Sequence, residues 1–186
     1  MLFNLPNLLT LSRIAAIPLL VACFWLDHGW AQWLSAGLFV VACVTDWFDG
    51  YFARRYHQIS RFGRFLDPIA DKLLVAAALV MLVDSGQLRG VHVLAALIIL
   101  AREILVSGLR EFLAELRVGL PVSQLAKWKT AAQFVAIAFL LLGDAVAPIV
   151  GQIGLVLIWI AAALTLVTGY DYLRTGLRHM AEGGPT

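Results

Sequence analysis

Charged residues are scarce in this chain, and their scarcity excludes most classes of soluble protein. Only 14% of the 186 residues are Asp, Glu, Lys or Arg, whereas 61% are hydrophobic. Soluble domains carry about 25% charged and about 45–50% apolar residues. A soluble core of this length would not bury so many apolar side chains, so the excess is expected to face lipid. The net charge of +2 is too small to indicate a nucleic-acid partner.

Cysteine is nearly absent as well. Cys23 and Cys43 both stand inside apolar runs, where a thiol behaves as a small hydrophobe. Their number and spacing exclude a disulfide framework and a cysteine-based metal site. Basic residues are also missing ahead of the first apolar stretch, which argues against a removable signal peptide.

Long apolar stretches dominate what remains. A helix that crosses a bilayer needs about 20 mostly apolar residues. Six stretches meet this requirement, at residues 7–26, 30–54, 61–83, 91–115, 123–143 and 148–173. The sequence therefore predicts an all-α integral membrane protein with six transmembrane helices, in a single domain over residues 1–186. Residues from about 182 to 186 are rich in Gly and Pro and are predicted to form a disordered tail.

Basic residues fall on alternate links between these stretches. They gather in the second link, around the fourth and after the last stretch, at Arg54, Arg55, Arg61, Arg64, Arg117, Lys127, Lys129, Arg174 and Arg178. Because links rich in Lys and Arg stay on the cytoplasmic side, both termini are predicted to be cytoplasmic. The expected location is the inner membrane of a bacterium.

Four aspartates interrupt the second and third stretches. Asp46 and Asp49 are three residues apart and Asp67 and Asp71 are four apart, so each pair shares one face of a helix. Small residues lie on the same faces, at Gly50, Ala53 and Gly63, and leave room for a ligand. Ser60 is a candidate N-cap of the third helix, and Pro68 fits that helix if it lies close to the first turn. The short link predicts antiparallel packing, which would bring all four carboxylates together near the cytoplasmic surface.

Converging carboxylates need compensating positive charge at membrane depth. Oxygen ligands alone favour hard divalent cations such as Mg²⁺ or Mn²⁺, and two such ions suit phosphoryl transfer. Another interpretation stays open for any single aspartate, which would be solvated or paired with Arg54 or Arg64.

The aspartates belong to a longer pattern, Asp46-x2-Asp49-Gly50-x2-Ala53-Arg54-x8-Gly63-x3-Asp67-x3-Asp71. This pattern resembles the complete signature of the CDP-alcohol phosphotransferase family, and the six-stretch layout extends the resemblance over nearly the whole chain. The resemblance implies that the four aspartates bind metal and that Asp71 is also the catalytic base. It further implies that these residues bind the CDP-linked lipid: Asn7, Thr10, Gly50, Ala53, Arg54, Ser60 and Gly63. The motif at residues 7–10 also fits a capped first helix. The family further suggests a homodimer.

Polar residues in the fourth and fifth stretches indicate which acceptor reacts with the CDP-linked lipid. Four cations lie there, Arg102, Arg110, Lys127 and Lys129, and cations of this kind suit a phosphorylated acceptor. Two simpler roles remain open, because Glu103 would pair with Arg110 and the lysines would reach the membrane surface. Segments 4–10, 65–72, 101–103 and 127–133 resemble family members that join CDP-diacylglycerol to glycerol 3-phosphate. Inositol phosphate or phosphatidylglycerol as acceptor, and an ion-coupled transporter, are the alternatives.

Overall fold

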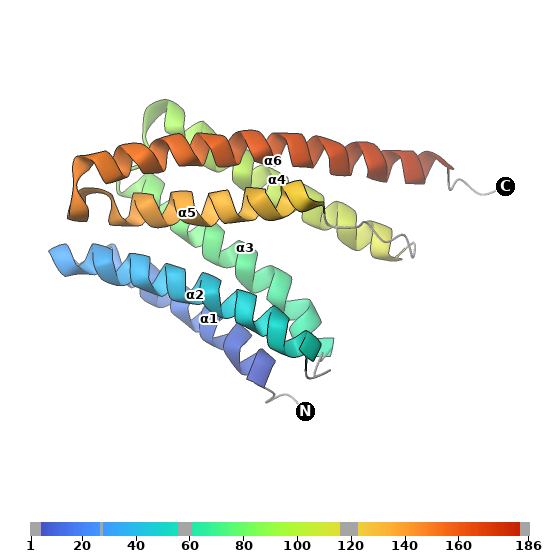
Figure 1. Ribbon diagram of the computed structural model, residues 1–186, viewed down its shortest axis with the longest axis horizontal. Coiled ribbons are helices and arrows are strands. Elements are labelled where there is room, and N and C mark those ends of the chain that lie inside the picture. The colour runs from blue at the N-terminus through green and yellow to red at the C-terminus, as the bar shows by residue number, and fades with distance from the viewer. Residues whose placement is uncertain (1–4, 27, 56–60, 116–122, 183–186) are drawn as a thin grey trace. The chain divides into compact units, whose positions relative to one another are not determined.

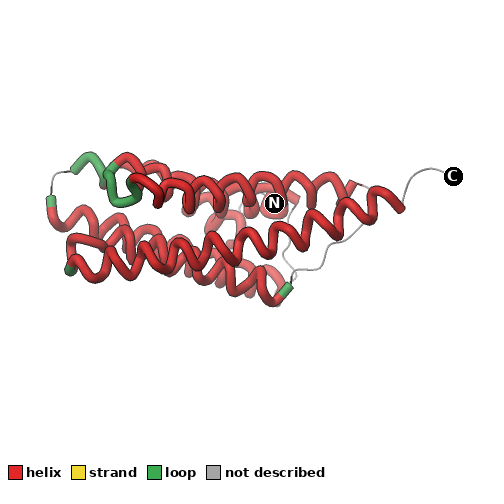
Figure 2. Tube along the Cα trace, turned by 90° about the horizontal axis from the view of Figure 1, so that it is seen from above, coloured by secondary structure: helices red, strands yellow, loops and turns green. Residues whose placement is uncertain are grey.

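The computed structural model describes the chain except residues 1–4, 27, 56–60, 116–122 and 183–186. Its elements are α1 (Leu5–Cys23), α2 (Gly29–Arg55), α3 (Arg61–Asp84), a 3₁₀ turn η1 (Gly90–His92), α4 (Val93–Glu115), α5 (Gln124–Val146) and α6 (Pro148–Glu182) (Figure 1). Figure 2 shows helices and turns and no strand in the described residues. The all-α prediction is therefore confirmed for this part of the chain.

The helices follow the predicted apolar stretches closely, with two differences. Helix α6 continues to Glu182, past the predicted end at residue 173. The prediction ended where the apolar residues end, whereas the charged and polar residues that follow are also helical. Helix α5 is interrupted at Gly143 (φ 7°, ψ −104°), where the fifth stretch was predicted to end. The predicted tail at 183–186 lies outside the described residues.

Among the described residues, three helical segments are long and apolar enough to cross a membrane, Gly90–Ala114, Gln124–Gly143 and Pro148–Arg178. The apolar helices Asn7–Cys23 and Gly29–Thr45 are shorter. Large apolar side chains face outward, among them Trp25, Ile104 and Trp128, which are 74%, 72% and 71% exposed. Outward-facing apolar side chains are expected of an integral membrane protein, because lipid replaces water around them. Six crossings, both termini in the cytoplasm and a single domain over 1–186 stay predictions.

The chain forms two compact units. The first comprises residues 1–88 and 137–154, in which α1 packs against both α2 and α3. Its fully buried side chains include Leu20, Phe39, Leu74 and Leu79. Thr10 of α1 contacts Asp67 of α3, and Cys23 and Ser85, at the other ends of these helices, line one cavity of about 410 Å³. Helices α1 and α3 therefore run in the same direction.

The second unit comprises residues 89–136 and 155–186. Trp159 Nε1 donates to His92 Nδ1 at 3.0 Å, and Arg102 Nη2 donates to Thr168 Oγ1 at 3.2 Å. Further along, Gly176 lies against Leu109. These contacts join residues 66 or 67 positions apart, so α4 and α6 run parallel in a constant register. This register decides which α6 residues reach the polar side chains of α4.

Candidate functional site

Asp67 and Asp71 lie one turn apart near the start of α3. Both side chains are partly buried, and that of Asp67 remains 46% exposed. The predicted common face of the two carboxylates is therefore present, with Gly63 buried one turn before Asp67. A pair of partly open carboxylates of this kind offers oxygen ligands for a hard cation.

Two residues of α1 contact the first of these carboxylates. The hydroxyl of Thr10 donates to Asp67 Oδ1 at 2.5 Å, and Arg13 Nη2 lies 3.9 Å from the same oxygen. Thr10 and Arg13 are 1% and 2% exposed. The first helix thus contributes a donor and a positive charge to the aspartate end of α3.

Arg13 was not predicted to belong to the site. The sequence holds one signal for it, since a basic residue within an apolar helix is expected to face the protein interior and to serve a function. The open alternative paired single aspartates with Arg54 or Arg64, whose side chains lie outside the described part of the chain. For Asp67 the structure shows Arg13 as a partner. A buried positive charge therefore lies beside the Asp67 carboxylate.

The start of α1 also bears on the motif at residues 7–10. The helix begins at Leu5, so Asn7 and Thr10 lie after its first residue and neither caps it. Both side chains are buried, at 1% exposure. The capped-helix alternative is therefore wrong, and a role for these side chains inside the site remains a prediction.

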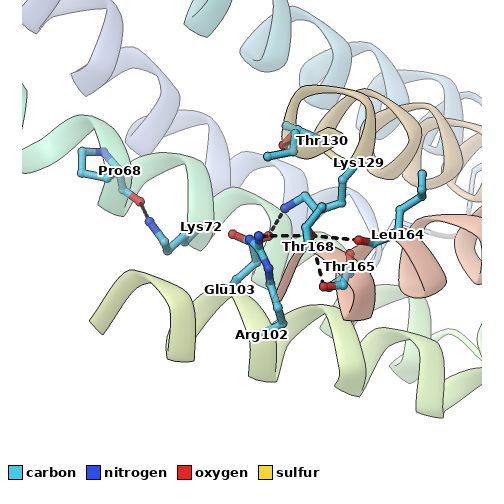
Figure 3. Close-up of polar contacts among 10 residues, drawn as sticks. Pro68, Lys72, Arg102, Glu103, Lys129, Thr130, Leu164, Thr165 and Thr168 are labelled. Atoms are coloured by element: carbon cyan, nitrogen blue, oxygen red, sulfur yellow. Dashed lines mark hydrogen bonds and ion pairs between the residues drawn. The ribbon is translucent and has the colours of Figure 1, made fainter. Parts of the chain in front are cut away.

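Pro68 stands between the two aspartates and lies deeper in α3 than the sequence analysis assumed. The helix begins at Arg61, so Pro68 is beyond the first turn and supplies no N–H to the carbonyl of Arg64. Lys72 Nζ donates to the Pro68 carbonyl at 2.9 Å (Figure 3). A positive charge is thereby held one residue after Asp71.

The other predicted residues of the aspartate site lie in α2 or just after it. Asp46, Asp49, Gly50, Ala53 and Arg54 are helical, but their side chains, like all of Ser60, lie outside the described part of the chain. Within the described part, no three His, Cys, Asp or Glu side chains are grouped to hold a metal. Convergence of all four aspartates therefore stays a prediction.

A second polar cluster joins α4, α5 and α6 (Figure 3). Lys129 of α5, only 3% exposed, forms an ion pair with Glu103 of α4. The neighbouring Arg102 Nη1 lies 3.4 Å from the same carboxylate oxygen, and Arg102 Nη2 reaches Thr168 of α6. Glu103 therefore pairs with Lys129 and Arg102 and not with Arg110.

The remaining two predicted cations, Arg110 and Lys127, are exposed. Lys127 and Lys129 are two residues apart on α5, so they point to nearly opposite sides of the helix. Ser123 accepts a hydrogen bond from Ala126 N at 3.2 Å and thus caps α5. The structure divides the four cations into a paired set, with Lys129 buried and Arg102 partly buried, and an exposed set, Arg110 and Lys127.

Known proteins resemble the chain over most of its length. The family model for CDP-alcohol phosphatidyltransferase matches residues 3–167. A protein of Rickettsia bellii (strain RML369-C), named CDP-diacylglycerol–glycerol-3-phosphate 3-phosphatidyltransferase, is 50% identical over 173 residues, covering 92% of this chain and 94% of the relative. A protein of the same name from Salmonella choleraesuis (strain SC-B67) is 48% identical, covering 93% and 94%. Another from Cereibacter sphaeroides is 40% identical, covering 97% and 98%.

Proposed function

The chain belongs to the CDP-alcohol phosphatidyltransferase family, and we propose that it transfers the phosphatidyl group of CDP-diacylglycerol to glycerol 3-phosphate, releasing CMP. The observation that carries this proposal is the similarity to relatives that bear the name of this reaction, at 40–50% identity over nearly the whole chain. The paired carboxylates on α3 supply chemistry that suits it.

We propose that Asp46, Asp49, Asp67 and Asp71 hold two divalent cations, Mg²⁺ or Mn²⁺. The donor set of this site fits such ions, because Asp67 and Asp71 present carboxylate oxygens from one face of α3 and hard cations prefer oxygen. When bound, these ions neutralise charge on the diphosphate of the lipid. The buried Arg13 adds positive charge on the Asp67 side.

In the proposed reaction, Asp71 accepts the proton of the sn-1 hydroxyl of glycerol 3-phosphate. The hydroxyl oxygen forms a bond to the phosphorus that carries the diacylglycerol, and the bond from that phosphorus to the bridging oxygen of the diphosphate breaks. CMP leaves with the electron pair of this bond. Asn7, Thr10, Gly50, Ala53, Arg54, Ser60 and Gly63 are assigned to binding the CDP-linked lipid. Positioning and electrostatic stabilisation supply most of the rate enhancement in phosphoryl transfer.

Arg102, Arg110, Lys127 and Lys129 are assigned to the phosphate of the acceptor. The chemistry of the residues supports this assignment, since guanidinium and ammonium groups form charge-assisted hydrogen bonds to phosphate. The exposed Arg110 and Lys127 are free of ion pairs to other described residues. We further propose a homodimer in a bacterial inner membrane, with both termini and the active site on the cytoplasmic side.

Release of CMP by the purified protein tests the function directly. With CDP-diacylglycerol as donor, glycerol 3-phosphate is expected to support turnover, and inositol phosphate, serine and phosphatidylglycerol to support little or none. The physical reason is that the acceptor needs a hydroxyl that attacks and a phosphate that binds the cations, and the whole molecule must fit the site. Turnover with inositol phosphate or phosphatidylglycerol alone would keep the chemistry and replace the acceptor. The absence of CMP release with every acceptor would contradict the proposal.

Substitution of single cations tests the acceptor site. Hydrogen bonds to charged groups contribute about 1.5–3 kcal/mol, so Arg110→Gln or Lys127→Gln is expected to lower kcat/KM for glycerol 3-phosphate roughly ten- to hundredfold. The KM for CDP-diacylglycerol should change much less, because its diphosphate is held by other residues. Arg102→Gln and Lys129→Gln should act in the same direction, but they also break the buried pairs with Glu103.

Arg89→Gln is the control, because Arg89 is exposed at the start of η1 and has no assigned role. Steady-state kinetics with each substrate varied in turn provides the measurement. If all four cation variants keep wild-type kinetics toward glycerol 3-phosphate, the acceptor phosphate binds elsewhere.

A further inference from the structure

Arg102 reaches across from α4 to a short segment of α6, and this segment has no role in the function proposed above. Its guanidinium donates to the hydroxyl of Thr168 at 3.2 Å and its Cζ lies 5.6 Å from the ring centroid of Tyr172. We infer that Thr168 and Gly169 are positioning residues for Arg102 and thereby set the affinity for a phosphorylated acceptor. This inference rests on the proposed function.

The hydroxyl of Thr168 is oriented to accept. Its Oγ1 lies 2.8 Å from the carbonyl oxygen of Leu164 and 3.2 Å from that of Thr165, so its hydrogen is donated to the backbone of α6. The same oxygen accepts the hydrogen bond from Arg102 Nη2 (Figure 3). Thr168 is 1% exposed, which keeps water from competing for this hydrogen bond.

Gly169 provides the space that the arginine stem occupies. A Cβ at this position would lie 3.0 Å from Arg102 Cγ and 3.7 Å from Nε. Cγ is near the backbone end of the side chain, so it gives way only if the whole stem moves. The absent side chain at 169 thus fixes the direction in which Arg102 leaves α4.

The charge balance around Arg102 favours an anion. Among the described residues, Glu103 is the acid that Arg102 contacts, and the same carboxylate oxygen also binds Lys129. The other partners of the guanidinium, a hydroxyl and an aromatic ring, are neutral. In this part of the chain two cations thus contact one carboxylate oxygen, and arginine is well suited to phosphate.

Stability alone does not explain the arrangement. Arg102 Nε is buried without a hydrogen-bond partner in the described structure, and such a group costs free energy. Burying an arginine stem against a glycine with one donor unsatisfied is expected where the placement of the guanidinium serves a ligand. The ligand class that fits is a phosphate monoester such as the proposed acceptor.

The test compares four variants of the full-length protein. Thr168→Val keeps the shape of the side chain and removes the acceptor, so the KM for glycerol 3-phosphate is expected to rise roughly tenfold. Thr168→Ser keeps the hydroxyl and should stay within about twofold of wild type. Gly169→Ala should raise the same KM roughly tenfold, since it displaces Arg102. The KM for CDP-diacylglycerol should change little in all of them.

Gly176→Ala is the matched control for crowding on α6. A Cβ there would lie 2.9 Å from Leu109 Cδ2 on α4, so it strains the same pair of helices without touching Arg102. It should lower the Tm and leave the KM for glycerol 3-phosphate unchanged. An equal rise of KM in Gly176→Ala and Gly169→Ala, or a wild-type KM in Thr168→Val, would overturn the positioning role.

A binding measurement separates this inference from the proposed function. Glycerol 3-phosphate should raise the Tm of the wild type and of Gly176→Ala, and should raise that of Thr168→Val much less at the same concentration. A wild type that binds in this way but releases no CMP would overturn the function and leave the positioning role standing. If the wild type turns over normally and glycerol 3-phosphate raises the Tm of Thr168→Val as much as that of the wild type, the function stands and the positioning role is overturned. A wild type that neither reacts nor binds glycerol 3-phosphate would overturn both.

Discussion

The variant Asp71→Asn is expected to lower kcat by about 10²- to 10⁴-fold, which is the usual contribution of a general base. Asparagine has nearly the same shape as aspartate but does not accept the proton of the acceptor hydroxyl. Binding of CDP-diacylglycerol should survive in part, because Asp46, Asp49 and Asp67 remain. Measurement of kcat by CMP release, together with binding of the CDP-linked lipid, checks both expectations.

Asp84→Asn is the matched control for this substitution. Asp84 is the last residue of α3 and is exposed, so the same chemical change at the other end of the same helix should leave kcat within about twofold of wild type. A near-normal kcat in Asp71→Asn would show that another group accepts the proton.

Removal of divalent cations is expected to abolish activity altogether. With excess EDTA, the proposed carboxylate cluster would face the negatively charged diphosphate without metal ions between them. Among the described residues, Arg13 is the cation that forms an ion pair with Asp67, and one guanidinium does not replace two divalent ions. Repulsion between like charges in a partly buried site is large. Turnover should return when Mg²⁺ or Mn²⁺ is added in excess of the chelator, because both ions accept oxygen ligands.

EDTA that has been saturated with Mg²⁺ beforehand should have no effect, which separates loss of metal from any direct effect of the chelator on the membrane protein. Full turnover in the presence of free chelator would refute the assignment of two metal ions to the four aspartates. Recovery with Zn²⁺ but not with Mg²⁺ would replace the oxygen-only site with one that includes other ligands.

The helices were predictable because their signal is local. Apolar stretches of the required length predict each of the six α-helices of the described chain, and the break in α5 at Gly143 coincides with the predicted end of the fifth stretch. The ends that were missed lie where polar residues continue a helix, as in α6 beyond residue 173. Helix continuation there depends on intrinsic propensity and not on burial in lipid, so hydropathy carried no information about it.

The candidate site was predictable only in part. The family signature identified the aspartates, and spacing along α3 correctly placed Asp67 and Asp71 on one face. Spacing within one helix does not show which other helix supplies the partners. It therefore does not reveal Arg13 on α1 as a partner of Asp67, and it offers Arg110 as a partner for Glu103 where the structure has Lys129. Lys127 and Lys129 were grouped because they are close in sequence. In the structure Lys129 is buried and Lys127 is exposed.

The contacts of Thr10 and Arg13 with Asp67 bear on how this protein is best handled. Thr10 is only nine residues after Met1, so an affinity tag or fluorescent reporter fused at the amino end is joined close in sequence to a side chain that contacts Asp67. Helix α6 continues from Tyr172 to Glu182, beyond the segment that holds Arg102. A fusion at the carboxyl end is therefore separated from the cluster around Arg102 by the last turns of a helix, and it is the better choice for purification and for activity measurements.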